Sequence, residues 1–413
     1  MRSQRLRLLF VNGALVVLSF AVAVLLGELL VRRVAPQNRP LSVALRHLHV
    51  PDAELGYLMA PHFRRRVRTP VFEGDVRTNS LGLRDHEIGP PRPGTLRILG
   101  LGDSFAFGVH AGPLENCYLK RLEAHLARRL LEGPTRASRW DGVEIVNAGV
   151  VGYGTPQEVG LLQRLGDSLQ PDAVLLSFYL GNDFTDNSGR TRMTVVDGYQ
   201  MLEASAAPYR AHSRPLHRRA RLHLHAHSQL YLLLKQRLLH PTRSWLAGSA
   251  NLASAATDRK PLDYYRFDAG FANSMRVELT PDMTTAMQET RRALDELRHW
   301  CETHGAAALL VAIPAEQQVD VAAKERWLRS FGLEAEELDF GLPNRRLARL
   351  AEEVGLPLYD LTQEFAARIA AGAELHLTGD NHWNSAGHAA AAELLVEPVL
   401  QRLVTPTPLL GSR

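Results

Sequence analysis

Cysteine is scarce in this chain of 413 residues, which contains only Cys117 and Cys301. The two lie far apart and show no metal-ligand spacing, which argues against a metal site built on clustered thiolates. We interpret both as buried free thiols, and the alternative is a bridge formed in an oxidising compartment. Neither cysteine lies where a thiol nucleophile is expected.

Charge of one sign is also lacking, because the formal net charge is only +4 and charged residues make up 22% of the chain. The basic residues are nearly all arginine, and no basic stretch interleaved with aromatic residues occurs, so the sequence predicts no nucleic-acid partner. Hydrophobic residues reach 45%, which argues against a disordered chain. The length allows one large domain or two modest ones.

A long apolar run extends from Leu8 to Val31, and its only charge is Glu28 near the far end. A helix of that length spans about 36 Å, enough to cross a hydrocarbon core of about 30 Å. A signal peptide is the alternative, because the AVA triplet at 21–23 resembles a cleavage site, but the apolar run continues beyond it. We therefore favour an uncleaved anchor with a short N-terminal tail inside and a large domain outside.

The sequence pattern after the anchor changes at about residue 96. Residues 35–95 carry Pro, Gly and Arg in irregular order without a helical period, so we predict a juxtamembrane lead-in with room for short strands. Residues 1–34 are accordingly taken as cytoplasmic tail and transmembrane anchor, 35–95 as the lead-in, and 96–405 as the main domain.

The main domain alternates short apolar runs with amphipathic segments. The runs predict strands buried on both faces of a parallel sheet, at 96–102, 143–149, 173–181, 307–314 and 357–362. The segments between them predict helices at 115–132, 156–169, 284–304, 343–354 and 385–403. This alternation favours an α/β fold, a three-layer sandwich with a five-stranded, mostly parallel sheet.

A helical insertion at about 190–290 breaks the alternation between the third and fourth runs. It would lie over the carboxyl edge of the sheet, where open α/β folds bind ligands, so it is a candidate lid or substrate-selecting element. Within it, His223, His225 and His227 are two residues apart, and the outer pair could share a helical face and bind a metal. Because no Cys or carboxylate is nearby, we interpret them as a solvated basic face that could rest on anionic lipid, and we predict no metal site.

The triplet Gly-Asp-Ser occurs twice, ending at Ser104 and at Ser168. Ser104 comes just after the first predicted strand and before a helix, where the chain turns sharply and a hydroxyl is displayed at the edge of the sheet. Ser168 is late in an amphipathic segment with no strand before it. We therefore take Ser104 as the candidate nucleophile, with a plain helix N-cap as the alternative.

Two loops after later strands offer hydrogen-bond donors for an oxyanion. Gly152 lies in a glycine-rich loop after the second run and can present a bare N–H, although Gly149 and Gly154 compete for that role. Asn182 follows the third run and offers an amide donor, with bracing of its own loop as the alternative.

A histidine and an acid occur together before the last predicted helix. Asp380 and His382 are two residues apart on a segment that we expect to be a loop, and His388 is a rival to His382 as the base. Asp183 is a second acid, which we expect to fix its own loop through backbone hydrogen bonds.

Together the four motifs resemble the blocks of the SGNH/GDSL hydrolase superfamily, in the family's order. They are Gly102-Asp103-Ser104, the NAGVVG segment at 147–152, Gly181-Asn182-Asp183 and the DNHWN segment at 380–384. The resemblance covers roughly residues 95–403 apart from the insertion, and it implies a flavodoxin-like SGNH hydrolase fold. It further implies Ser104 as nucleophile, His382 as base and Asp380 as the acid that orients it. The implied oxyanion hole consists of the Ser104 N–H, the Gly152 N–H and the Asn182 side chain, and no cofactor is implied.

One departure from the family concerns the acid. The common pattern has it three residues before the histidine, where this chain has Gly379, whereas Asp380 is two before. The arrangement resembles the D-x-H-W variant of membrane-anchored bacterial relatives and of the alginate O-acetyltransferase group. A helix N-cap remains the alternative role for Asp380.

The function that the resemblance implies is a serine esterase hydrolysing acyl esters, O-acetyl groups in particular, on cell-envelope carbohydrate. Two alternatives stay open: an O-acetyltransferase of envelope polysaccharide with the same triad, and a catalytically inactive envelope binding module. The expected location is the bacterial inner membrane, single-pass, with the catalytic domain periplasmic or otherwise extracytoplasmic. The expected partners are an acylated carbohydrate or other ester substrate and the membrane, and polysaccharide acetylation or export machinery is left open as another.

Overall fold

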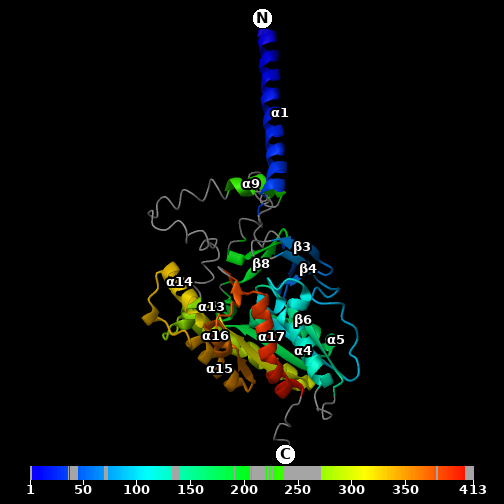
Figure 1. Ribbon diagram of the computed structural model, residues 1–413, viewed down its shortest axis with the longest axis vertical. Coiled ribbons are helices and arrows are strands. Elements are labelled where there is room, and N and C mark those ends of the chain that lie inside the picture. Colours follow the sequence, from blue (N-terminus) through cyan, green and yellow to red (C-terminus); the bar gives the residue numbers. More distant parts are fainter. Residues whose placement is uncertain are drawn as a thin grey trace, which may run out of the picture.

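The computed structural model gives the path of most of the chain (Figure 1). It describes residues 2–35, 37, 45–68, 73–132, 140–189, 191–204, 206, 220, 223–224, 227–235, 271–377 and 380–404. Most of the predicted insertion at about 190–290, including His225, therefore lies outside the described residues.

A five-stranded parallel sheet forms the centre, in the order β11-β10-β7-β5-β6. Its strands are β5 (Thr95–Gly102), β6 (Gly142–Gly149), β7 (Ala173–Tyr179), β10 (Ala307–Ile313) and β11 (Leu358–Asp360). All four pairings are parallel, so the carboxyl ends of the strands meet at one edge of the sheet. The predicted five-stranded α/β sheet is confirmed, although β11 ends at Asp360, two residues before the predicted end.

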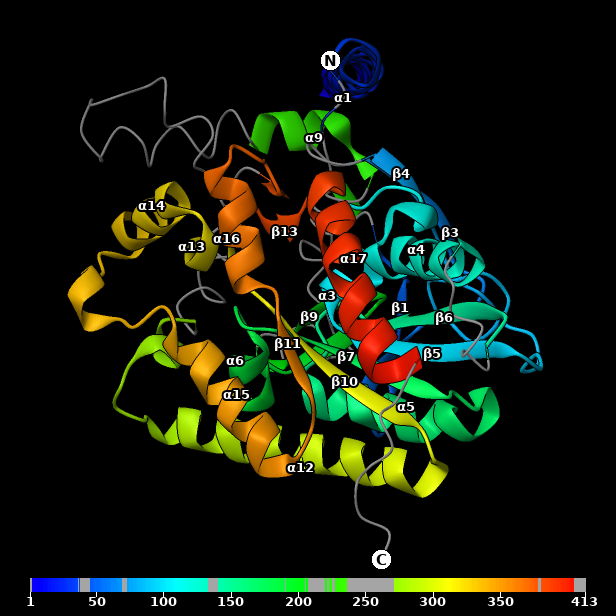
Figure 2. The ribbon, with the colours of Figure 1, turned by 60° about the horizontal axis from the view of Figure 1, so that its bottom comes forward.

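Helices cover both faces of this sheet, as the apolar strands predict. Alternate strand residues point to opposite faces, so Leu99 and Leu101 of β5 belong to one hydrophobic cluster and Ile98 to the other. The first cluster contains residues of α5 (Thr155–Leu169), α12 (Pro281–His304) and α15 (Leu342–Val354). The second contains residues of α4 (Tyr118–Glu132), α16 (Thr362–Ala370) and α17 (Ser385–Val399). Figure 2 shows α12 and α5 on one side of the sheet and α17 and α4 on the other.

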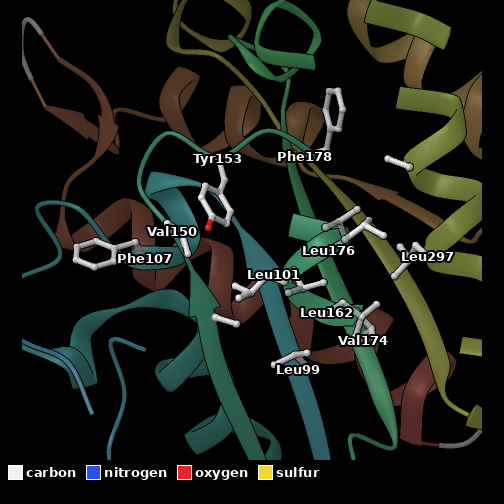
Figure 3. Close-up of a cluster of buried hydrophobic side chains, with 14 of the residues drawn as sticks. Leu99, Leu101, Phe107, Val150, Tyr153, Leu162, Val174, Leu176, Phe178 and Leu297 are labelled. Atoms are coloured by element: carbon white, nitrogen blue, oxygen red, sulfur yellow. The ribbon is translucent and has the colours of Figure 1, made fainter. Parts of the chain in front are cut away.

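The packing between strands and helices is continuous in the first cluster. Figure 3 shows Leu99 and Leu101 of β5 beside Val174 and Leu176 of β7, with Leu297 of α12 nearby. Because both faces are covered in this way, β7 is buried along its whole length, which is why its sequence is apolar without alternation.

The remaining helices are short or were not predicted. Their bounds are α3 (Ser104–Phe107), α6 (Asp183–Asn187), α9 (Gln229–Leu234), α13 (Glu316–Val319) and α14 (Val321–Phe331), with π-helical residues Leu400–Val404 after α17 and two short 3₁₀ turns, Leu114–Asn116 and Ala335–Glu337.

The lead-in folds into two antiparallel hairpins. They are β1 (His49–Asp52) with β2 (Gly56–Met59), and β3 (Arg64–Arg68) with β4 (Glu73–Arg77). A third antiparallel hairpin, outside the lead-in, pairs β8 (Met193–Val196) with β9 (Tyr199–Leu202). The buried residues Tyr57, Met59, Val67 and Val76 belong to the same cluster as Leu99 and Leu101. The lead-in therefore packs on the main core.

The outer edge of the sheet is closed by side chains. On β6, the Ile145 N–H donates to a Glu123 carboxylate oxygen at 2.6 Å and the Asn147 N–H donates to Asp85 at 2.7 Å. Lys120 lies between these two acids and donates to the Ile145 carbonyl at 2.9 Å. Since these backbone groups are satisfied, β6 presents no free edge there for another strand.

The N-terminal helix α1 (Arg2–Val34) extends away from the sheet (Figure 1). Its segment Phe10–Val34 is, within the described part of the chain, the helix long and apolar enough to cross a membrane, with a mean hydropathy of 2.6. The same length and composition suit a signal sequence.

The single acid of the apolar run has a structural role. The Glu28 carboxylate accepts hydrogen bonds from the Ser228 hydroxyl at 2.8 Å and from the N–H groups of Gln229 and Leu230 at 2.8 and 2.9 Å. Glu28 therefore caps the N-terminus of α9, which lies beside the C-terminal end of α1 (Figure 1).

Candidate active site

Ser104 lies at the abrupt junction of β5 and α3. Gly102 has a φ of +152°, and a Cβ there would lie 2.8 Å from the Ala106 Cβ and 3.1 Å from the Ser177 Cβ, so only glycine fits. Asp103 caps α3, since its carboxylate accepts from the Phe105 N–H at 2.8 Å. The turn leaves Ser104 as the first residue of α3, at the carboxyl end of the strand.

The second Gly-Asp-Ser triplet has no such setting. Ser168 is exposed near the end of α5, and its hydroxyl donates to the Leu165 carbonyl at 2.8 Å within the same helix. The structure thus separates the two serines as the sequence predicts.

His382 and Asp380 lie on a short strand, so the expectation of a loop was wrong. The strand β13 (Asp380–Trp383) pairs with β12 (His376–Leu377) in an antiparallel hairpin. Side chains two residues apart on a strand point to the same face. The extended backbone therefore brings Asp380 and His382 together, and the short spacing between them follows from it.

The three side chains form a continuous hydrogen-bonded row. His382 Nε2 lies 2.8 Å from the Ser104 Oγ, and His382 Nδ1 lies 2.6 Å from Asp380 Oδ1. The same Asp380 oxygen also accepts from the His382 backbone N–H at 3.0 Å. Because a carboxylate only accepts, Nδ1 carries the proton, and Nε2 is left to accept the proton of the serine hydroxyl.

The electrostatic setting keeps Asp380 ionised. Burial acts to raise its pKa, but the charge of His382 and the hydrogen bonds from His110 and His382 outweigh burial and hold the pKa well below its usual value. An ionised carboxylate beside Nδ1 stabilises the imidazolium that forms when His382 takes a proton.

A second acid touches the serine. The Ser104 Oγ lies 3.3 Å from Asp103 Oδ2, farther than from His382. Burial raises the pKa of Asp103, against the lowering effect of hydrogen bonds from the Phe105 and Ser104 N–H groups and of the His382 charge. Sequence reasoning missed this contact, because Asp103 was read only as part of the motif.

Of the three glycines that compete for the oxyanion hole, Gly152 is the one whose N–H has no hydrogen-bond partner within the described residues. The Gly149 N–H donates to the Asn147 side chain at 3.0 Å, and the Gly154 N–H donates to Gln157 at 3.3 Å. No partner for the Gly152 N–H occurs within the described ranges. Its φ of +77° is the left-handed conformation that glycine adopts without strain.

The direction of the Gly152 N–H is fixed by hydrogen bonds to the carbonyl of the same peptide group, that of Val151. The Val151 carbonyl accepts from the Tyr57 hydroxyl at 3.0 Å and from Gln200 Nε2 at 2.8 Å. In a trans peptide the C=O and the next N–H point in opposite directions. Tyr57 of β2 and Gln200 of β9 therefore turn the Gly152 N–H away from themselves.

Asn182 occupies the N-cap position of α6, after β7, without a side-chain capping hydrogen bond. Its Nδ2 donates one hydrogen to Asp186 Oδ2 at 2.8 Å, which leaves the second hydrogen of the amide available. Burial raises the pKa of Asp186 to about 7, with a hydrogen bond from Thr191 acting against it and the charge of Asp103 adding to it. Asp186 was not singled out from the sequence.

The strand order brings these loops to one edge. β6, β5 and β7 are neighbours, and the Val150 N–H donates to the Gly102 carbonyl at 2.9 Å. A Cβ on Gly149 would lie 2.2 Å from the Phe107 N, so the glycine lets the β6 end pass close to α3. The loops carrying Gly152 and Asn182 thus flank Ser104.

The rival residues have other surroundings. His388 is 1% exposed on α17, between Tyr118 and Trp383, and burial lowers its pKa to about 3, so it is a core residue. Asp183 accepts from the Tyr179 N–H at 2.7 Å and so fixes its own loop, as predicted.

The two cysteines and the histidine groups that could bind a metal lie as follows. Both cysteines are buried and free. The His223 and His227 rings lie 4.5 Å apart, while His225 is outside the described residues. His110, Asp380 and His382 offer ligand atoms within 4.8 Å of one another, a group that the sequence did not suggest because His110 is far from the other two along the chain.

Comparison with known proteins gives matches in structure only. No family model and no curated protein matches the chain. An acetyl xylan esterase is similar at 13% identity and a TM-score of 0.38, over 74% of this chain and 100% of that one. The lipase/acylhydrolase from Enterococcus faecalis is similar at 14% identity and a TM-score of 0.38, over 76% and 98%. A two-domain esterase active on acetylated mannans is similar at 14% identity and a TM-score of 0.37, over 77% of this chain and 52% of that one.

These three solved structures are esterases or acylhydrolases. A serine, a histidine and a carboxylate in one hydrogen-bonded row, at the carboxyl edge of a parallel sheet, are the groups that a serine hydrolase needs.

Proposed function

We propose that this protein is a membrane-anchored serine hydrolase of the SGNH/GDSL type that cleaves acyl esters, O-acetyl esters in particular, on cell-envelope carbohydrate. The observation that carries the proposal is the position of His382, which contacts the Ser104 hydroxyl through one nitrogen and Asp380 through the other. A binding module would not need an imidazole with a hydroxyl at 2.8 Å and a carboxylate at 2.6 Å.

In the proposed first step, His382 Nε2 takes the Ser104 proton while the Ser104 Oγ attacks the acyl carbonyl. The imidazolium that results is stabilised by Asp380. Collapse of the tetrahedral intermediate releases the sugar hydroxyl, which receives the proton from His382. Water then attacks the acyl-enzyme with His382 as base again, which frees the acid and restores Ser104.

The negative oxygen of the intermediate is the second requirement. The proposed donors are the Ser104 N–H, the Gly152 N–H and the remaining Asn182 amide hydrogen. Asn182 suits this role because one of its two amide hydrogens goes to Asp186 and the other has no partner within the described part of the chain. Gly152 suits it because its N–H likewise has no partner there, while the Val151 carbonyl before it is held by Tyr57 and Gln200. Donors held in advance cost no reorganisation during the reaction, which is the main source of their effect.

The proposed location follows from α1. Its apolar segment would hold the protein in the inner membrane with the catalytic domain on the outer side, where envelope carbohydrate is found. Polysaccharide acetylation or export machinery is the partner proposed for this setting.

The test uses the full chain in detergent, with an aryl acetate, acetylated xylan and acetylated mannan as substrates. Acetate release is expected from the wild type, and Ser104→Ala is expected to lose about three orders of magnitude or more in kcat. Ser168→Ala is the matched control, because it removes the same triplet hydroxyl from an exposed helix position. Equal rates for the wild type and Ser104→Ala would overturn the proposal.

The same assay separates hydrolysis from transfer. If the protein is a hydrolase, acetate appears at the rate of ester loss and an added sugar hydroxyl acceptor does not change that balance. Transfer would instead show ester loss without acetate and acetylation of the acceptor, which would replace the hydrolase by the O-acetyltransferase with the same triad.

A further inference from the structure

Asp380 has a second partner besides His382. Its Oδ2 lies 3.3 Å from His110 Nε2, while its Oδ1 is occupied by the two His382 N–H groups. The His110 side chain is only 4% exposed, and its ring lies edge-on to the His382 ring at 5.7 Å. Each oxygen of the carboxylate therefore faces a different histidine.

The backbone of His110 is held in an unfavourable conformation. Its φ of +64° lies in the left-handed region, which is strained for a residue with a Cβ. The next N–H, that of Ala111, closes a turn by donating to the Gly108 carbonyl at 3.1 Å. Strain of this kind persists only where the surroundings fix it, and it is concentrated at functional sites.

Arg84 provides that fixation. It is 2% exposed, and its guanidinium donates to the carbonyls of Phe107 at 2.9 Å, Gly108 at 2.6 Å and Gly112 at 2.7 Å. These three carbonyls lie on both sides of His110. A buried arginine thus clamps the loop that carries the His110 ring toward Asp380.

The strand that carries the acid needs such support. Among the described residues β13 pairs with the two-residue strand β12 alone, and the pairing is irregular between His376 and Leu377. With only the hydrogen bonds to Oδ1, the carboxylate could rotate about its Cβ–Cγ bond. The His110 Nε2, at 3.3 Å from Oδ2, is placed to oppose that rotation by its attraction to the carboxylate, which would keep Oδ1 at His382 Nδ1.

We propose that His110 is a positioning residue of the triad, which holds Asp380 by its second oxygen and so fixes the orientation of His382. The inference rests on the proposed function, since it assigns a role within that same site. Loss of this contact to a charged group is expected to lower the rate roughly 10- to 100-fold.

The kinetic test compares two variants of the full chain. His110→Leu is expected to lower kcat about 10- to 100-fold with little change in KM. His110→Gln, whose amide nitrogen can donate from a similar place, is expected to recover most of that loss. In an Asp380→Asn background, His110→Leu is expected to have little further effect, since the two residues would act through one contact. Equal losses in both variants, or full additivity, would overturn the inference.

A spectroscopic test needs no substrate, so its result does not depend on the proposed function. The proton on His382 Nδ1, assigned by its loss in His382→Gln, is expected as a sharp, far-downfield NMR signal in the wild type. It should broaden in His110→Leu and persist in His110→Gln. An unchanged signal in His110→Leu would overturn the inference, whatever the activity.

The same histidines could instead bind a metal ion. Extended dialysis against EDTA is therefore included, followed by addition of Zn²⁺. Unchanged activity and an unchanged His382 signal are expected. Loss of activity on dialysis with recovery on Zn²⁺ would make His110 a metal ligand and overturn the positioning role.

Discussion

The contact between Asp380 and His382 allows a quantitative prediction for Asp380→Asn. Asparagine is nearly isosteric and keeps an oxygen that can accept from His382, so the variant removes mainly the negative charge. The Nδ1–Oδ1 distance of 2.6 Å places the two charge centres about 4 Å apart, where the attraction is about 4 kcal/mol at an effective dielectric constant of about 20. Because the imidazolium exists only during the reaction, kcat should fall about 1,000-fold.

The assay is acetate release from an aryl acetate, with kcat and KM determined separately. We expect KM to change by less than about threefold, since the charge acts on the reaction rather than on substrate binding. A kcat within about tenfold of the wild type would refute the electrostatic reasoning and favour a capping role for Asp380.

A matched control tests the strand geometry. In the double variant Asp380→Asn with Asn381→Asp the carboxylate moves by one residue and the net charge is that of the wild type. Adjacent residues on a strand point to opposite faces, so the new acid should not reach His382 and kcat should stay low. Recovery of activity in this variant would contradict the role given to β13.

Two further predictions concern Gly152 and Asp186, the acid that accepts from Asn182. Gly152→Ala should lower kcat about 100-fold, because its Cβ would lie 2.8 Å from Gln200 Nε2 and 3.1 Å from the Tyr57 hydroxyl, the two donors that hold the Val151 carbonyl and so orient the Gly152 N–H. The control Gly189→Ala has a similar φ of +78° in open space and should keep its activity. Equal rates in the two variants would refute the role of Gly152. Asp186 has its pKa raised to about 7 by burial, so the stability it contributes is complete below pH 4 and is lost as the pH rises through 7. The free energy of unfolding of the wild type, measured with urea, should therefore fall between pH 6 and 8 by of the order of 1 kcal/mol more than that of Asp186→Asn, and parallel curves would contradict this.

The sheet was predictable because its physical cause is local. A strand buried on both faces is apolar along most of its length, and the runs that form β7 and β10 show this directly. The end of the last strand was not predictable in the same way. The Asp360 side chain accepts from the Thr362 N–H at 2.9 Å and so starts α16, inside a run that reads as continuous.

The placement of the candidate residues was predictable where each motif follows a strand. Ser104, Gly152 and Asn182 each follow a run whose end can be read from the sequence, and the parallel order then brings them to one edge. The pairing of β12 with β13 depends on contacts outside the motif, so a strand was not expected at Asp380.

The supporting residues were missed for a similar reason. His110 and Asp186 act through contacts that no spacing rule encodes, across 270 positions of the chain in the case of His110 and Asp380. A weak local signal for His110 exists, since glycines at 108 and 112 flank it and mark a tight loop.

The cap that Glu28 gives to α9 bears on how the protein could be processed. A cut after the AVA triplet at 21–23 would remove the first part of α1 but leave Glu28 on the retained fragment. The contacts with Ser228, Gln229 and Leu230 could then survive release from the membrane. The second half of the apolar helix thus contributes contacts to the folded protein, and exchanging the whole helix for an unrelated membrane segment would remove the carboxylate that accepts three hydrogen bonds at the start of α9.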